Sequence, residues 1–197
     1  MTFNIRGSCK EDGVSIWENR ADLNIKTIQK YAPDLLGFQE LQAGNLKNYQ
    51  QKLREYNYCL GKPYNREGRQ LYNAIFWKAN QFKVLQNNSF YLSETPEKWS
   101  TSWESARVRC ATWVILENLE RNYQVLHLNT HLDHLSVTAR QEGIKLILQQ
   151  LATLRENNRT VLLTGDFNSY LRLSPDDGSL QSVDGVYSLL KEAGFID

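Results

Sequence analysis

The sequence predicts an α/β domain, and three observations support this prediction. Short apolar runs of strand length alternate with longer runs in which apolar residues recur at helical spacing. The 197 residues suit one large domain, which we expect to span residues 1–197. Hydrophobic residues make up 41% and charged residues 23%, as in ordinary globular proteins, and no internal repeat interrupts the pattern.

The first half of the chain predicts three strands and two helices. A strand is expected over residues 1–5, and apolar residues at helical spacing predict a helix from Trp17 to Ala32. Pro33 ends that helix, because the residue before a proline avoids helical geometry. The other elements expected here are a strand over 34–39, a helix marked by Leu46, Tyr49 and Leu53, and a strand over 71–77.

The second half predicts a long loop, three strands and two helices. Residues 90–105 are rich in Ser, Thr, Glu and Trp, so we expect a surface loop. Strands are expected over 108–116, 123–130 and 161–164, where apolar residues alternate or run together. Helices are expected around 144–154 and over 186–191.

The overall charge and the cysteines narrow the class of protein. The formal net charge of +1 shows no basic excess, so nucleic acid is not indicated as a partner, although a local basic patch stays open. Cys9, Cys59 and Cys110 form no paired motif, and their odd number favours a reducing, cytoplasmic compartment. No apolar run approaches the roughly 20 residues of a membrane span.

Several of the expected strands end at a chemically capable polar residue. In α/β sheets, sites gather at such strand ends, and the candidates are Asn4, Glu40, His131, Asp166 and Asn168. Glu40 follows an apolar strand, where a carboxylate is costly unless it is paired, solvated or bound to metal. A hard cation such as Mg²⁺ often takes only one or two protein carboxylates. The alternative for Glu40 is an ordinary solvated strand end.

Asp166 and Asn168 follow the apolar strand over 161–164, after Gly165. In extended geometry they project to the same side, with Phe167 facing the core. A carboxylate can orient and deprotonate water, and a neighbouring amide can hold a phosphoryl oxygen without adding charge. The alternative is an Asx-type turn that caps the strand, with Gly165 allowing close backbone approach.

The three histidines, His127, His131 and His134, lie close together in the sequence. A zinc site is one interpretation, but no cysteine lies nearby and the spacing matches no helix-borne zinc pair. We instead expect a hydrogen-bonded core residue at 127, a catalytic residue at the strand end at 131, and a solvent-exposed side chain at 134.

Two arginines and a tyrosine are candidates for contact with a substrate. Arg107 and Arg109 flank Val108 on an expected strand, and arginines on one face make good bidentate phosphate clamps. Charges on a solvated sheet face are the alternative. Tyr72 opens an expected strand near the same rim, where it could donate a hydrogen bond to a phosphoryl oxygen or simply pack.

Together these motifs resemble the endonuclease/exonuclease/phosphatase superfamily, whose fold is deoxyribonuclease-I-like. The matching segments are MTFNIR at 1–6, PDLLGFQE at 33–40, NTHLDH at 129–134 and TGDFN at 164–168. The looser FYLSETP at 90–96 is similar to a bacterial subgroup. The resemblance implies a four-layer α/β sandwich. It also implies a later Asp-bearing strand and a terminal Ser-Asp-His motif, so we expect the domain to be C-terminally incomplete at Asp197 and to lack its last strands.

The resemblance also implies roles for the strand-end residues in hydrolysis of a phosphoester. Glu40 and Asn4 would belong to the site of a Mg²⁺ or Mn²⁺ ion, with Glu40 the main ligand. His131 would polarise the phosphoryl group, Asp166 would orient or deprotonate the attacking water, and Asn168 would hold the phosphate.

Substrate class stays open at this level, because the superfamily includes nucleases, phosphoinositide phosphatases, sphingomyelinases and RNA deadenylases. Arg109 is implied to lie on the substrate side. A non-catalytic relative that binds a phosphorylated ligand or a protein partner is the alternative function.

Overall fold

Two packed β-sheets flanked by helices make up the protein. The computed structural model describes residues 1–66, 69–156, 159–175 and 180–196, so Asp197 lies outside the described residues. In spatial order, the first sheet contains β1 (Thr2–Asn4), β2 (Leu35–Gln39), β6 (Ile75–Lys78) and β3 (Tyr56–Cys59). The second contains β10 (Arg159–Asp166), β9 (Gln124–His131), β8 (Cys110–Asn118) and β7 (Phe82–Tyr91).

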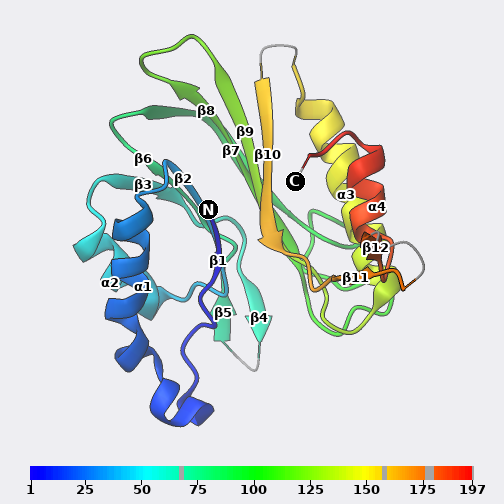
Figure 1. Ribbon diagram of the computed structural model, residues 1–197, viewed down its shortest axis with the longest axis horizontal. Helices are drawn as coiled ribbons and strands as arrows, with labels where there is room; N and C mark the ends of the chain where they lie inside the picture. The colour runs from blue at the N-terminus through cyan, green and yellow to red at the C-terminus, as the bar shows by residue number, and fades with distance from the viewer. Residues whose placement is uncertain (67–68, 157–158, 176–179, 197) are drawn as a thin grey trace.

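Helices cover the outer face of each sheet. The first sheet is covered by α1 (Trp17–Tyr31) and α2 (Ala43–Lys52), and the second by α3 (Val137–Leu154) and α4 (Val186–Glu192) (Figure 1). The order helix, sheet, sheet, helix confirms the predicted four-layer α/β sandwich. None of the helices within the described ranges is long and apolar enough to cross a membrane.

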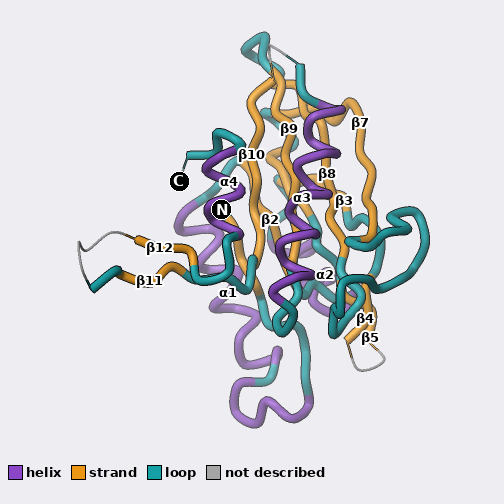
Figure 2. The backbone as a smooth tube through the Cα atoms, turned by 90° about the vertical axis from the view of Figure 1, so that its right-hand side faces the viewer, coloured by secondary structure: helices purple, strands orange, loops and turns teal. Residues whose placement is uncertain are grey.

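Smaller elements connect the layers. They are the 3-10 helix η1 (Lys10–Ser15), the hairpin of β4 (Tyr64–Arg66) with β5 (Arg69–Leu71), and the hairpin of β11 (Leu171–Leu173) with β12 (Leu180–Ser182). The β11–β12 hairpin projects away from the two sheets (Figure 2). The sequence patterns predicted none of these short elements.

The helix α1 shows how the periodic pattern produces burial. Trp17, Ala21, Ile25 and Ile28 form its buried apolar face against the first sheet. The helix ends at Ala32, which adopts a left-handed conformation (φ 41°) immediately before Pro33. The predicted span from residue 17 and the stop at the proline are therefore confirmed.

Apolar side chains fill all three spaces between the four layers. Ile75, Trp77, Phe82, Val114 and Leu116 pack between the two sheets, and separate clusters lie beneath each helical layer. β1 and β2 of the first sheet contact β9 and β10 of the second sheet. There a Cβ built on Gly37 would lie only 2.2 Å from Thr164 Oγ1, so the approach requires glycine.

A buried polar layer joins the sheets beside Gly37. Gln39 Nε2 and Thr164 Oγ1 both donate to Asn129 Oδ1, at 2.7 and 3.1 Å. Asn129 Nδ2 donates to the backbone oxygens of Phe38 and Ala74, at 2.7 and 3.0 Å. Because these buried groups satisfy one another, the polar layer fixes how one sheet sits on the other.

The structure differs from the sequence-based expectations in several strands, and β3 was not predicted. The strand β7 was not predicted, because it lies at the edge of its sheet and its residues 83–88 are exposed, which removes the alternating pattern. The strand expected over 71–77 is β6, which begins only at Ile75, while Tyr72 forms an isolated bridge with Leu41. The strand expected from residue 108 begins at Cys110, so Arg107 and Arg109 precede it.

Candidate active site

Parallel pairing brings the strand-end residues together at one edge of the sandwich. In the first sheet β1 pairs with β2 in parallel, with Asn4 opposite Gln39, the residue before Glu40. In the second sheet β10 pairs with β9 in parallel, with Asp166 opposite His131. Because β1 also contacts β10 across the sheets, all four strand ends meet at one place.

Asn4 connects the two carboxylates of the site. Its Nδ2 donates to Asp166 Oδ2 at 2.8 Å and lies 3.3 Å from Glu40 Oε1. Its Oδ1 accepts from the backbone N–H of Arg6 at 2.8 Å. Asn4 therefore reaches the site through its amide nitrogen rather than through the oxygen expected of a metal ligand, and it holds carboxylates from different sheets together.

Left-handed backbone conformations shape two of the site residues. Glu40 (φ 62°) and Asn168 (φ 47°) both have positive φ, which is uncommon outside glycine. The backbone N–H of Asn168 donates to Asp166 Oδ1 at 3.1 Å, and its Nδ2 donates to Leu132 O at 3.0 Å. The expected extended geometry through residue 168 is thus wrong, because β10 ends at Asp166 and the chain turns there. Asn168 still lines the site, because this Asx-type turn carries it back toward Asp166.

A buried tyrosine contacts His131 on the side away from Asp166. Tyr64, which is only 1% exposed, accepts a hydrogen bond from the backbone N–H of Glu40 at 3.2 Å. Its hydroxyl lies 3.3 Å from His131 Nδ1. The other ring nitrogen, Nε2, lies 3.7 Å from Asp166 Oδ2. His131 is therefore held between a phenol and a carboxylate.

A buried arginine supplies positive charge opposite the carboxylates. Arg109 is 7% exposed, and its Nε has no hydrogen-bond partner within the described part of the chain. The same Nε lies 3.8 Å from Asp133 Oδ2, and Nη2 lies 3.3 Å from His134 Nδ1. The guanidinium therefore lies between an acidic side chain and an imidazole at the edge of the site.

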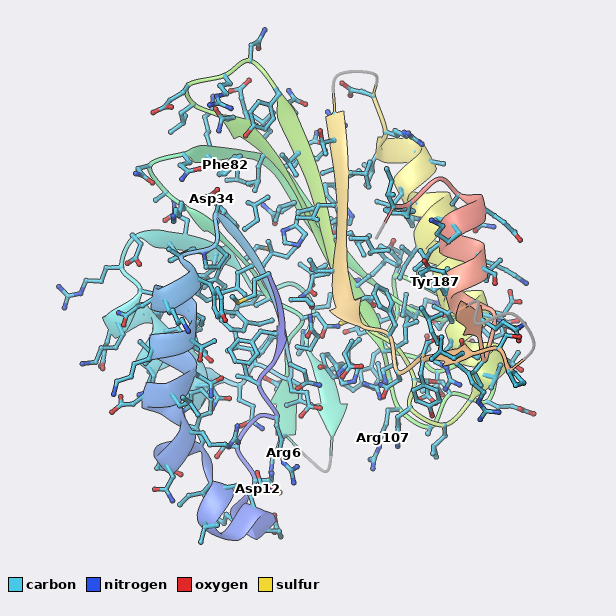
Figure 3. All side chains as sticks on the ribbon, viewed as in Figure 1. Arg6, Asp12, Asp34, Phe82, Arg107 and Tyr187 are labelled. Carbon is cyan, nitrogen blue, oxygen red and sulfur yellow. The ribbon has the colours of Figure 1, made fainter. Side chains whose placement is uncertain are left out.

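These groups surround one cavity of about 200 Å³. Its lining residues are Glu40, Tyr64, Leu71, Arg107, Arg109, His131, His134, Asp166 and Asn168. Arg107 lies at the end of the molecule toward which β10 points, as does Arg6 near the end of β1 (Figure 3). The cavity therefore combines carboxylates, imidazoles and guanidinium groups at the strand ends.

The surroundings of Asp166 favour its charged form. Burial opposes ionisation, but the His131 imidazole, the Asn4 amide and the Asn168 backbone N–H together hold the pKa of Asp166 below its ordinary value. Burial likewise lowers the pKa of the Arg109 guanidinium, which nearby anionic groups oppose. Asp166 is thus ionised near neutral pH.

The donor set fits a hard divalent cation better than zinc. Glu40 and Asp166 offer carboxylate oxygens in one cavity, as Mg²⁺ or Mn²⁺ prefers, and such ions retain several water ligands. Among the described residues, no three His, Cys, Asp or Glu side chains form a cluster that could hold a metal ion. Glu40 and Asp166 are the two carboxylates that such an ion would meet in the cavity.

The three histidines do not form the alternative zinc site. His127 is fully buried, with Nε2 2.8 Å from Thr164 Oγ1, and burial lowers its pKa to about 3. His134 is exposed at the rim, with 42% of its side-chain surface accessible. His131 is buried at the strand end, where it lines the cavity beside Asp166, so the three imidazoles lie in different surroundings.

The structure does not bring Tyr72 to the cavity. Tyr72 packs against the core beneath α2, and its hydroxyl donates to Gln70 at 3.2 Å. Tyr64 lies in the cavity instead, and no sequence pattern predicted it there. The available signal was weak, namely Gly68 between two short runs that could pair as a hairpin.

Comparison with known proteins agrees with this geometry. The model of the Endonuclease/Exonuclease/phosphatase family matches residues 1–182. Uncharacterized protein L388 of Acanthamoeba polyphaga mimivirus is 24% identical over 164 residues, which cover 78% of this chain and 59% of that protein.

Two solved bacterial structures are similar in fold and sequence. A mannosyl-6-phosphatase of Bacteroides thetaiotaomicron is 28% identical with a TM-score of 0.79, over 86% of this chain and 64% of that one. An endonuclease/exonuclease/phosphatase of Bacteroides vulgatus is 26% identical with a TM-score of 0.82, over 99% of this chain and 70% of that one. The chain thus spans less than two thirds of the mimivirus protein and of the mannosyl-6-phosphatase. By its family match, its fold and its strand-end site, the chain belongs to the Endonuclease/Exonuclease/phosphatase family.

Proposed function

We propose that the protein is a phosphoester hydrolase that depends on Mg²⁺ or Mn²⁺. The observation that carries the proposal is the pairing of Glu40 and Asp166 through Asn4, opposite the buried guanidinium of Arg109. Members of this family are phosphoesterases or nucleases, which agrees with that arrangement. Glu40 would be the main ligand of the cation, which supplies Lewis-acid stabilisation of the phosphoryl oxygens when bound.

The remaining residues divide the work of an in-line attack by water. Asp166 orients the water and accepts its proton, since its carboxylate is ionised and held by Asn4 and Asn168. His131 and Arg109 place donors where negative charge develops on the phosphoryl group. Asn4 keeps the two carboxylates in place.

The substrate class is proposed from the size of the cavity and from similarity to a known phosphatase. The cavity of about 200 Å³ is large enough for a phosphoryl group and the first atoms of its leaving group. The similar mannosyl-6-phosphatase is named for a sugar phosphate monoester. We therefore propose a phosphate ester of a small molecule as the first substrate class to test, with diesters and nucleic acids in parallel.

The test is hydrolysis of sugar phosphates, simple diesters and single-stranded nucleic acid with Mg²⁺, with Mn²⁺ and with chelator. We expect turnover only with the cation. Glu40→Gln and Asp166→Asn should each lower kcat by at least about 10²-fold, because each removes a charge that acts on the developing transition state.

A matched control separates this effect from general damage. Asp22→Asn removes an exposed carboxylate on α1, outside the cavity, and should leave turnover unchanged. Hydrolysis that persists at full rate in chelator, or in either cavity variant, would remove the metal or that residue from the proposed reaction.

A further inference from the structure

The contacts of Tyr64 determine which nitrogen of His131 carries a proton. The phenol oxygen has two hydrogen-bonding neighbours among the described residues, the backbone N–H of Glu40 at 3.2 Å and His131 Nδ1 at 3.3 Å. A backbone N–H can only donate, so it occupies a lone pair of the phenol oxygen. The hydroxyl hydrogen then has His131 Nδ1 as its acceptor.

Burial keeps this arrangement in place. Tyr64 is 1% exposed, and burial holds the pKa of its phenol above the ordinary value, so the hydroxyl hydrogen is retained. A buried hydroxyl that fails to donate forfeits a hydrogen bond, which costs free energy. If Nδ1 of His131 carried the proton instead, the hydroxyl hydrogen would lose this acceptor.

The opposite side of the imidazole favours the same assignment. Nε2 of His131 lies 3.7 Å from Asp166 Oδ2. The Asp166 carboxylate accepts from the Asn4 amide and the Asn168 backbone N–H, and a carboxyl group is ionised at about pH 8. A proton on Nε2 faces this negative charge favourably, whereas a bare Nε2 lone pair would be repelled by it. Two independent neighbours therefore select one tautomer.

We propose that Tyr64 is a positioning residue that fixes the neutral imidazole of His131 as the Nε2–H tautomer, so that Nε2–H is the donor presented to the phosphoryl group. The consequence for catalysis rests on the proposed function, but the tautomer itself does not. The donor is then available without protonation of the ring, because the phenol rather than a carboxylate supports Nδ1.

The first test reads the tautomer directly. Long-range ¹H–¹⁵N NMR of histidine-labelled protein, at about pH 8 where an ordinary imidazole is neutral, distinguishes a bare nitrogen from one that carries hydrogen. His131→Gln identifies the signals of His131 by their loss. We expect a proton on Nε2 and a bare, hydrogen-bonded Nδ1. A proton on Nδ1 in the unmodified protein would overturn the inference, without need of any variant.

The second test removes the phenol hydroxyl. Tyr64→Phe should move the His131 signals toward a mixture of tautomers and lower kcat about tenfold, with a smaller change in KM. Unchanged ring signals in Tyr64→Phe would contradict the proposal. Tyr91→Phe is the matched control, because Tyr91 belongs to the same buried cluster but its hydroxyl donates to Pro63 O at 3.3 Å. It should change neither the signals nor kcat.

A double-mutant comparison separates positioning from simple packing. In His131→Gln no tautomer remains to be selected, so adding Tyr64→Phe should lower kcat further by about twofold or less. An undiminished tenfold loss would assign Tyr64 a role independent of His131. If no phosphoester is hydrolysed while the spectrum shows Nε2–H, the proposed function fails and the tautomer assignment stands.

Discussion

Asn4 and His127 are polar side chains whose contacts differ with their position in the fold. Asn4 is placed between two carboxylates that would otherwise repel each other. His127 is enclosed between the sheets, where its Nε2 bonds Thr164 while its Nδ1 has no hydrogen-bond partner in the described part of the chain. An imidazole in such surroundings favours the neutral form, because a charged ring would lose its hydration.

This burial predicts a dependence of stability on pH. The pKa of His127 is lowered to about 3 in the folded protein, against 6.5 for an ordinary histidine. Below pH 6.5 His127 is protonated in the unfolded chain but stays neutral in the folded protein. The free energy of unfolding therefore falls as pH decreases toward the folded pKa. The loss attributable to His127 should reach about 2 kcal/mol at about pH 5 relative to neutral pH.

Urea denaturation of the unmodified protein and of His127→Gln, at neutral pH and at about pH 5, measures this loss. Because Gln does not titrate, the variant should lack this part of the pH dependence, whatever its stability at neutral pH. Equal pH dependence in both proteins would show that His127 does not titrate on unfolding.

At the scale of elements, the site depends on how closely β2 approaches the second sheet. The parallel pairs β1–β2 and β9–β10 each align two strand ends, but only contact between the sheets unites the pairs. Gly37 permits this contact, since its position faces Thr164 and Asn129 with no room for a side chain. The absence of a side chain at Gly37 therefore allows the two sheets to bring the site residues together.

We expect Gly37→Ala to destabilise the protein by about 1–3 kcal/mol, as overpacking in a close-packed interior does. The added Cβ would lie 2.2 Å from Thr164 Oγ1 and 2.7 Å from Asn129 Oδ1, so the sheets must separate. Gly44→Ala is the matched control, because its Cβ meets nothing within 4 Å on α2 and should stabilise the helix by about 0.5–1 kcal/mol.

Chemical denaturation of both variants measures these changes. If Gly37→Ala were as stable as the unmodified protein, the two sheets would separate at little cost in free energy, contrary to this prediction. Gly37→Ala should also lose turnover, because separation of the sheets would move Glu40 and Asp166 apart.

At the scale of the whole molecule, the site lies between two sheets that are formed by different parts of the chain. Glu40 comes from the first sheet, and His131 and Asp166 come from the second. A ligand that binds residues of both sheets must therefore stabilise the packing of one sheet on the other. Removing a carboxylate charge from this site should raise the stability of the metal-free protein and remove the stabilisation that the metal gives.

We expect saturating Mg²⁺ to raise Tm, by an amount equivalent to about 2.7 kcal/mol at a hundred times the Kd. Glu40→Gln should raise Tm in chelator, because it removes like-charge repulsion with Asp166, and should abolish the increment from Mg²⁺. Thermal denaturation at matched ionic strength, with Asp22→Asn as the control that keeps the increment, tests both effects. An increment that survives in Glu40→Gln would place the cation elsewhere.

The sequence by itself determined the α/β class, most of the long elements and the strand-end residues, and its resemblance to a family implied the four layers. The helix from Trp17 and the strands before Glu40 and Asp166 were predictable because periodic burial leaves a pattern in local sequence. Tertiary structure alone decided that Tyr64 contacts His131, that Tyr72 does not reach the cavity, and that Asn4 offers nitrogen rather than oxygen. The contacts of Tyr64 with His131 and of Asn4 with Asp166 join residues far apart in the chain, and a local sequence pattern does not predict such contacts.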